Sequence, residues 1–150
     1  MSVINSVIEQ AEKSCQEQGK QLTPKRKTVL RALVESNIAL SAYELIEYCK
    51  TRLDLTLQPM SVYRILDFLV EAHLVHKLKV SNKYIVCSHI RCEHDHGIPQ
   101  FLICTKCDKI TEQDLAPEMV IGLKSHARQQ GFTVTTQQLE INGICDDCSE

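Results

Sequence analysis

The chain has 150 residues, of which 43% are apolar and 24% charged, and its net charge at pH 7 is −2. This length suits one large domain or two small ones with a packed core, and the composition excludes wholesale disorder. No apolar run approaches the roughly 18 residues of a membrane span. The first residues also lack the basic start and apolar block of a signal peptide, so we expect a cytoplasmic protein.

The two halves of the chain differ in charge. Residues 1–83 hold 12 Lys/Arg and 9 Asp/Glu, whereas residues 84–150 hold 5 and 10. A mildly basic half therefore precedes an acidic half. The chain also has eight cysteines. In a reducing compartment, thiols bind metals or react more often than they form structural disulfides.

Two amphipathic helices are predicted near the start of the chain. Residues 3–18 repeat apolar positions at helical spacing. Residues 22–36 do the same, with Thr23 placed to cap the helix and Pro24 in its first turn, where a missing N–H does no harm.

A third helix is predicted over residues 41–53. Ser41, with Glu44 three residues later, matches a capping box. Apolar residues then recur at helical spacing, at Ala42, Leu45, Ile46, Cys49 and Leu53.

The fourth predicted helix covers residues 58–73. Its apolar stripe consists of Val62, Ile65, Leu66 and Leu69. Successive residues turn by about 100° around a helix axis, so Arg64 lies nearly opposite that stripe with Met60 beside it. Ser61 and Tyr63 lie on the flanks. We therefore expect Arg64 to face solvent while the opposite side of the helix packs.

Residues 74–80 and 83–87 predict two strands joined by a Ser-Asn turn. Short helices that end in a β-hairpin describe a winged helix-turn-helix, with residues 41–53 and 59–72 as the helix-turn-helix pair. Any small helical core followed by a hairpin has the same pattern, so the pattern alone leaves both interpretations open.

The second half predicts strands over residues 100–105 and 109–115, a helix opened by Pro117 and ended by Gly131, and a strand over residues 132–144. The apolar face of this helix would consist of Ala116, Met119, Val120, Leu123 and Ala127. The predicted fold class is α+β.

Two CxxC pairs, Cys104 with Cys107 and Cys145 with Cys148, predict a closed structural zinc site of four thiolates. The 37 residues between the pairs exceed ordinary zinc-ribbon spacing, but a helix and a strand between them could return the chain to its start. A redox-active thiol pair is the alternative, although one CxxC would suffice for that.

A second metal site is predicted around the segment CSHIRCEHDHG, residues 87–97, in which seven of eleven residues are metal donors. Its candidate ligands are His76, Cys87, His94, His96 and Glu112. Imidazole, thiolate and carboxylate donors together are compatible with zinc, and donors from both halves would join the two domains. A solvated loop of scattered polar residues is the alternative. His89 and Cys92 stay open as ligands, whereas Cys15 and Cys49 fit helix interiors.

Several segments resemble the ferric uptake regulator (Fur) family, namely LTPKRKTVLRAL, SAYELIEY, SVYRILDFLVEAHLVHK, YIVC, FLICTKCDKITE and GICDDC. The likeness spans about residues 8–148 and is strongest to the zinc uptake regulator branch. The resemblance implies a winged-helix DNA-binding domain over 1–87, a hinge and metal-binding loop over 88–99, and a small α/β dimerisation domain over 100–150. It also implies a homodimer that represses metal-uptake genes with bound metal as corepressor.

The same resemblance assigns ligands for at least two Zn²⁺ ions per subunit. The four CxxC cysteines match the family's structural zinc site. His76, Cys87 and Glu112 match three ligands of the regulatory zinc site. The fourth is a histidine ahead of the first CxxC, where the loop here is longer by a residue or two. His96 is our first choice and His94 the reserve.

For DNA, Tyr43, Tyr63 and Arg64 match contacting positions of the family, and Ser61 is a further DNA-binding candidate on the same helix. Arginine reads guanine through two hydrogen bonds. Candidates for phosphate contact, which orients a protein without reading sequence, are Lys25, Arg26, Lys27, Lys79 and Lys83.

The predicted function is a zinc-responsive transcriptional repressor whose zinc-loaded homodimer binds palindromic operators of zinc-uptake genes. We expect no enzymatic activity, no membrane partner and no small-molecule substrate. The alternatives are an iron, manganese or peroxide sensor on the same scaffold, a thiol-redox switch, and an enzyme with catalytic zinc. No HExxH motif supports the last alternative.

Overall fold

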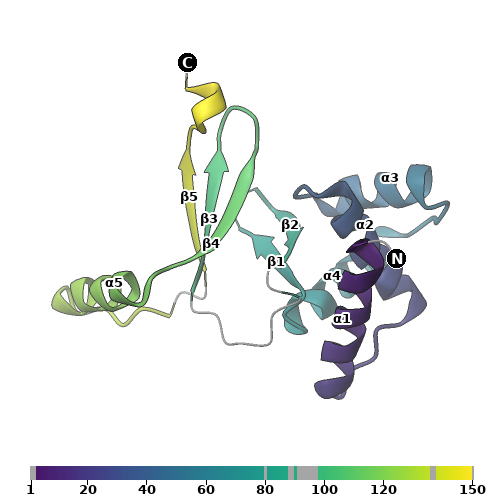
Figure 1. Cartoon of the computed structure of the whole chain (residues 1–150), viewed down its shortest axis with the longest axis horizontal. Helices are drawn as coiled ribbons and strands as arrows, with labels where there is room; N and C mark the ends of the chain where they lie inside the picture. The colour runs from purple at the N-terminus through teal and green to yellow at the C-terminus, as the bar shows by residue number, and fades with distance from the viewer. Residues whose placement is uncertain (1–2, 80, 88–89, 91–97, 136–137, 150) are drawn as a thin grey trace. The chain divides into compact units, whose positions relative to one another are not determined.

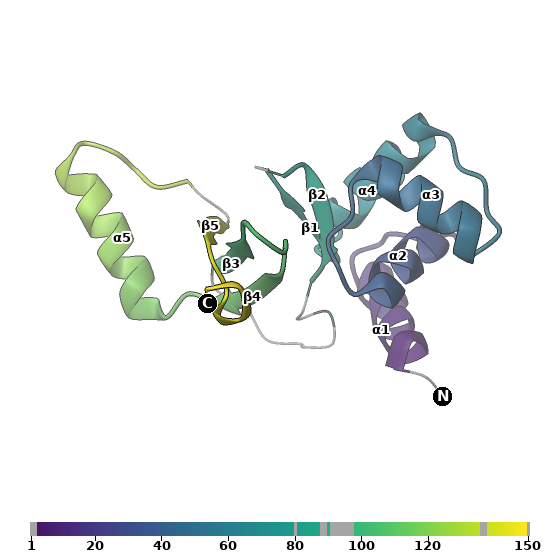
Figure 2. The ribbon, with the colours of Figure 1, turned by 90° about the horizontal axis from the view of Figure 1, so that it is seen from above.

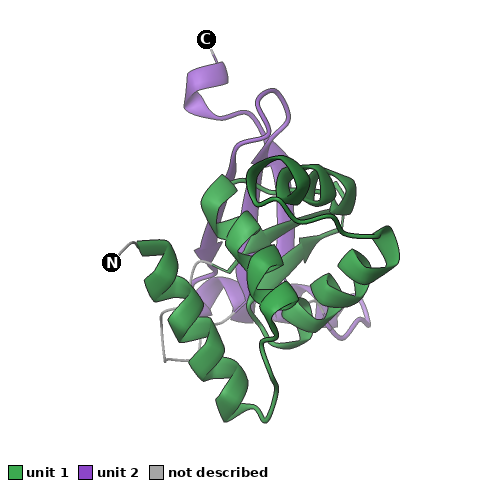
Figure 3. Cartoon of the chain, turned by 90° about the vertical axis from the view of Figure 1, so that its right-hand side faces the viewer, with its two compact units in different colours: residues 1–92 green, residues 93–150 purple. Residues whose placement is uncertain are grey.

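The computed structural model of the chain describes residues 3–79, 81–87, 90, 98–135 and 138–149. The chain divides into two compact units, residues 1–92 and 93–150 (Figure 3). The proposed hinge over residues 88–99 lies mostly outside the described residues, so the three-part division with its dimerisation role stays a prediction.

The first unit consists of four helices followed by an antiparallel hairpin (Figure 1). Its elements are α1 (Val3–Glu17), α2 (Pro24–Ser36), α3 (Ala42–Arg52), α4 (Pro59–Glu71), β1 (Val75–Leu78) and β2 (Lys83–Val86). All four predicted helices and the hairpin are confirmed. The turn between the strands ends at Asn82, whose φ of 55° is the left-handed conformation that asparagine tolerates.

The helix starts differ from one another in how they are capped. The predicted capping box is confirmed: the Glu44 N–H donates to the Ser41 hydroxyl at 3.2 Å, and the Ser41 N–H donates to the Glu44 carboxylate at 2.9 Å. The predicted capping of α2 by Thr23 is wrong, since its side chain makes no capping hydrogen bond. The start of α2 relies instead on Pro24, whose ring presets a helical φ.

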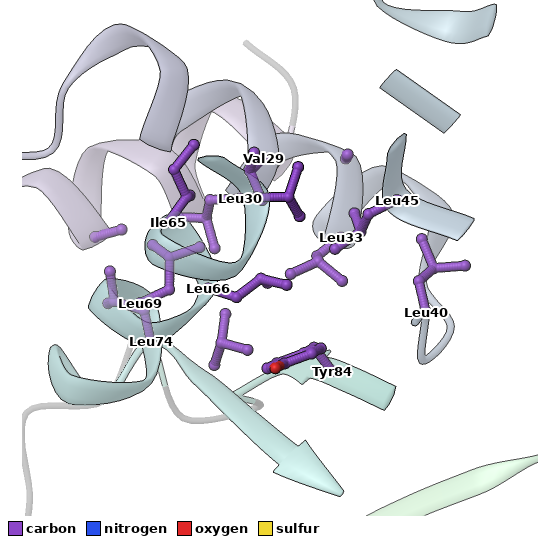
Figure 4. Close-up of a cluster of buried hydrophobic side chains, with 14 of the residues drawn as sticks. Val29, Leu30, Leu33, Leu40, Leu45, Ile65, Leu66, Leu69, Leu74 and Tyr84 are labelled. Carbon is purple, nitrogen blue, oxygen red and sulfur yellow. The ribbon is translucent and has the colours of Figure 1, made fainter. Parts of the chain in front are cut away.

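The core of the first unit is formed by side chains from α1, α2, α3, α4 and the hairpin. The predicted α4 stripe is buried, with Val62, Leu66 and Leu69 fully inaccessible. Figure 4 shows side chains of α4 meeting those of α2, with Tyr84 of β2 alongside. The backbone of Tyr84 exchanges hydrogen bonds of 2.8 and 3.0 Å with Leu40, which ties the hairpin to the segment before α3. The hairpin is thereby fixed to the helices.

The second unit is built on a three-stranded sheet in the order β4-β3-β5. Its elements are β3 (Pro99–Cys104), β4 (Ile110–Asp114), α5 (Pro117–Gln129), β5 (Leu139–Gly143) and a 3₁₀ turn, Asp146–Cys148. β3 pairs antiparallel with β4 and parallel with β5. The two parallel strands need a crossover, which α5 supplies, and Gly131 with φ 80° follows its C-terminus.

Two predictions for the second unit need correction. The predicted strand 132–144 begins only at Leu139, because the chain reaches β3 only where Leu139 lies opposite Gln100, and residues 132–135 have no strand beside them. The predicted apolar face of α5 is not buried: none of its side chains is inaccessible, and Met119 is 57% exposed. Figures 1 and 2 show α5 standing beside the sheet of its own unit rather than across it.

Candidate metal centres and nucleic-acid interface

The four CxxC cysteines gather at one end of the second sheet. Cys104 ends β3, and the parallel register places it opposite Gly143, two residues before Cys145. Both CxxC turns therefore leave neighbouring strands at the same end. Their four sulfurs all lie within 4.8 Å of one another, and none of the four cysteines forms a disulfide. These cysteines are Cys104, Cys107, Cys145 and Cys148.

Hydrogen bonds of the backbone and of two side chains hold the two turns against each other. The Thr105 N–H donates to the Gly143 carbonyl at 2.9 Å, and the Cys145 N–H donates to the Cys104 sulfur at 3.4 Å. The Lys106 ammonium donates to the Cys148 carbonyl at 3.2 Å. Sequence reasoning missed the roles of Thr105 and Lys106, although their position inside the first CxxC could have pointed to them.

The protonation of these thiols is uneven. The Cys145 backbone N–H, followed by that of Cys107, lowers the pKa of the Cys104 thiol to about 6. Hydrogen bonding to the Cys145 side chain, together with the other nearby sulfurs, raises the pKa of Cys148 to about 12. Four thiolates this close need a cation to balance their charge. A tetrahedral ion with affinity for sulfur, such as Zn²⁺, fits this donor set.

The hairpin of the first unit carries a second pair of donors. His76 lies on β1, and Cys87 follows β2, where its N–H donates to the Leu74 carbonyl at 3.0 Å. A ligand atom of His76 and the Cys87 sulfur lie within 4.8 Å of each other, and both residues are half-buried. An imidazole and a thiolate at this separation fit two ligands of a zinc ion and leave the remaining positions to other residues.

The remaining candidate ligands lie elsewhere in the chain. Glu112, half-buried on β4 opposite Phe101, belongs to the second unit. His94 and His96, like His89 and Cys92, lie outside the described residues, so their roles as ligands stay predictions. Cys15 and Cys49 are fully inaccessible, and burial raises the pKa of both thiols, as a core role requires.

The candidate DNA-reading residues lie on two helices of the first unit. Arg64 is exposed on α4, with Ser61 and Tyr63 half-buried on its flanks. Tyr43, in the first turn of α3, is 66% exposed. The expected orientation of Arg64 is confirmed, because the buried stripe on the opposite side of α4 fixes the direction of its side chain.

Among the candidates for phosphate contact, Arg26, Lys27 and Lys83 have partners within the first unit. The Arg26 guanidinium stacks over Phe68 at 3.8 Å and donates to the Gln21 carbonyl at 2.7 Å. Lys27 pairs with Glu12 at 2.9 Å, and Lys83 pairs with Glu44 at 3.6 Å. These partners indicate that the three cations also make contacts within the unit itself.

Comparison with known proteins shows which family the sequence matches. The sequence model of the ferric uptake regulator family matches residues 17–142. The zinc uptake regulation protein of Escherichia coli K12 is 33% identical over 144 residues, which cover 96% of this chain and 82% of that protein. The peroxide operon regulator of Bacillus subtilis is 26% identical over 144 residues, which cover 95% of this chain and 94% of that protein.

Solved structures agree with these relatives. A zinc uptake regulator complexed with zinc and DNA matches with a TM-score of 0.83 and 30% identity, over 99% of this chain and 96% of that one. The crystal structure of holo XcZur matches with a TM-score of 0.79 and 34% identity, over 97% of this chain and 98% of that one. Within the described residues, no helix is long and apolar enough to cross a membrane. The predicted resemblance is confirmed, and the chain belongs to the ferric uptake regulator family.

Proposed function

We propose that this protein is a zinc-responsive transcriptional repressor whose zinc-loaded homodimer binds near-palindromic operators of zinc-uptake genes. The observation that carries this proposal is the donor pair His76 and Cys87 on the hairpin that directly follows α4. Only residues 72–74 separate α4 from β1, and Leu74 lies in the same core as α4. An ion held at this pair is therefore attached to the helix that carries Arg64.

The regulatory zinc would be completed by residues beyond the first unit. We propose Glu112 and His96 as these ligands, with His94 as the reserve, and residues 88–99 as the hinge that supplies the histidine. An ion held by both units would favour one orientation of the DNA-binding heads. Metal and DNA then stabilise the same conformer, so each tightens the binding of the other.

The four cysteines 104, 107, 145 and 148 would hold the structural zinc. Such a closed site supplies no open coordination position for catalysis, and its contribution is folding energy for the second unit. This role favours a regulator over an enzyme. The proposed place of action is the cytoplasm, where the operator DNA lies.

Zinc is favoured over the metals of other family members by the donors of this chain. Cys87 is a soft ligand that favours zinc over the harder manganese ion. The relatives with zinc in their names also have the higher identities, 33% against 27% for the ferric uptake regulation protein of Campylobacter jejuni. An iron, manganese or peroxide sensor is the second candidate.

Homodimerisation is supported by the apolar surface of the second unit. Several of its large apolar side chains are more than a third exposed, namely Leu102, Met119, Ile121, Phe132, Ile141 and Ile144. Apolar exposure on this scale in a small unit indicates a surface that another chain covers. A two-fold dimer would present two α4 helices to a near-palindromic site.

A DNA-binding titration of the purified chain across zinc, iron and manganese tests the proposal, with chelator controls and metal counting. We expect zinc to tighten operator binding by roughly 5- to 150-fold, a coupling of about 1–3 kcal/mol. If the chelated protein, still dimeric and folded, binds operator as tightly as the zinc-loaded form, zinc regulation is wrong. A response to iron or manganese alone would favour the second candidate.

A further inference from the structure

The first turn of α4 carries an exposed apolar residue to which the proposed function gives no role. Met60, the second residue of α4, is 66% exposed. The core of the first unit includes Val62, Ile65, Leu66 and Leu69 of this helix but not Met60. Its thioether side chain therefore does not contribute to the folding of the unit through burial.

Met60 and Arg64 lie on the same face of α4. They are four residues apart in one continuous helix, so their side chains are neighbours about 40° apart around the axis. Both are exposed, and the buried stripe fixes this face toward solvent. An apolar side chain and a guanidinium thus stand together on the solvent face of α4.

The same face changes character toward the end of the helix. Asp67 and Glu71 follow at helical spacing and are also exposed. Their carboxylates repel a polyanion, whereas the turn with Arg64 attracts one. Along α4, contact with DNA would therefore be favoured at the Met60–Arg64 end, the N-terminal end with which recognition helices read base edges.

We infer that Met60 reads thymine: its side chain contacts the C5-methyl group of a thymine in the major groove, beside the guanine that Arg64 reads. This inference rests on the proposed DNA-binding function. The thymine methyl is the distinctive apolar group that base pairs present in the major groove. Methionine, unbranched and polarisable, suits such a contact. Each half-site of the operator should therefore contain a thymine close to the guanine that Arg64 reads.

The test removes one methyl group at a time from the DNA. The zinc-loaded full chain first selects its preferred duplex from a random pool. Copies are then made in which each thymine of one half-site is replaced by deoxyuridine, which pairs identically and lacks only the methyl. For the wild type, replacement at one position should weaken binding about fourfold, as expected for one buried methyl group. Met60→Ala should bind the thymine and deoxyuridine duplexes equally.

Two control variants separate a specific contact from a general effect. Met60→Leu keeps an apolar side chain and should keep a preference for thymine. Val3→Ala removes an apolar side chain that is 70% exposed on α1, and it should retain the full thymine sensitivity. Wild-type protein that binds every deoxyuridine duplex as tightly as its parent overturns the inference. So does Met60→Ala with thymine sensitivity intact.

Arg64→Ala distinguishes failure of this inference from failure of the proposed function. If Arg64→Ala loses discrimination between the selected duplex and random DNA while Met60→Ala stays sensitive to the thymine methyl, only the role of Met60 is wrong. If Arg64→Ala retains full discrimination, α4 is not the reading helix, and both assignments fail.

Discussion

The sulfurs of Cys107 and Cys145 lie 3.7 Å apart, although 38 positions separate the two residues along the chain. The parallel pairing of β3 with β5 produces this proximity, because it brings both CxxC turns to the same end of the sheet. The second unit is small and exposes much apolar surface, so we expect its folding to depend on the zinc ion proposed for these sulfurs.

Cys145→Ser should remove about one zinc ion per subunit and lower the free energy of unfolding of the second unit by several kcal/mol, since structural zinc contributes directly to folding. Metal counting and chemical denaturation would measure the two effects. Ser149→Ala, just beyond the second CxxC, is the matched control and should keep the ion. Unchanged zinc content in Cys145→Ser would remove this cysteine from the site.

Substitution of His76 or Cys87, the proposed ligands on the hairpin, should uncouple DNA binding from zinc without unfolding the chain. His76→Ala and Cys87→Ser should each keep the dimer and the structural zinc but lose most of the roughly 5- to 150-fold gain in operator affinity that zinc provides. Sedimentation, metal counting and a zinc titration of operator binding would measure these three properties.

The control for these two variants is His73→Asn. His73 is exposed and lies three residues before His76, and its φ of 61° is one that asparagine tolerates. This variant should respond to zinc like the wild type. An intact zinc response in Cys87→Ser would exclude Cys87 as a regulatory ligand.

Arg64→Ala should reduce the preference for operator over random DNA by about 1–3 kcal/mol while leaving binding to random DNA nearly unchanged, because one guanine contact is lost. Competition binding at fixed salt would measure the difference. Arg52→Ala is the matched control, since this exposed arginine at the end of α3 lies over the Tyr48 ring. Equal discrimination in the Arg64 variant and the control would contradict the assignment.

Glu44 should make the stability of the first unit depend on pH. The Ser41 backbone N–H lowers the pKa of the Glu44 carboxyl, with smaller contributions from the Ser41 hydroxyl and Lys83. A carboxyl whose folded-state pKa is depressed adds stability that is present above its unfolded pKa of about 4.3 and is lost as pH falls through the folded value.

Two substitutions of Glu44 distinguish how much its charge contributes to stability from how much its capping hydrogen bond contributes. Glu44→Gln keeps the hydrogen-bonding pattern, so at pH 7 it should cost only about 0.5 kcal/mol, a small value because the side chain is largely exposed. Glu44→Ala should cost about 1 kcal/mol. Urea unfolding followed by helical circular dichroism should show the difference between wild type and Glu44→Gln shrinking as the pH falls and disappearing below the folded-state pKa of Glu44, where the carboxyl is protonated in both states. A difference that persists there would refute the electrostatic origin.

Local features of this protein could be predicted from its sequence because each depends on residues within a few positions of one another. The α4 stripe, the Ser41–Glu44 capping box and the two CxxC pairs are of this kind. The direction of Arg64 follows from helical periodicity alone, and the donor types His and Cys already indicate zinc.

Only the tertiary structure decided the relationships between distant segments. The length of β5, the meeting of the two CxxC turns and the approach of His76 to Cys87 depend on strand pairing, which joins residues far apart in the chain. The exposure of the α5 apolar face was also decided by the tertiary structure. Periodicity shows that a helix has an apolar face, but whether that face is buried depends on which partner lies against it.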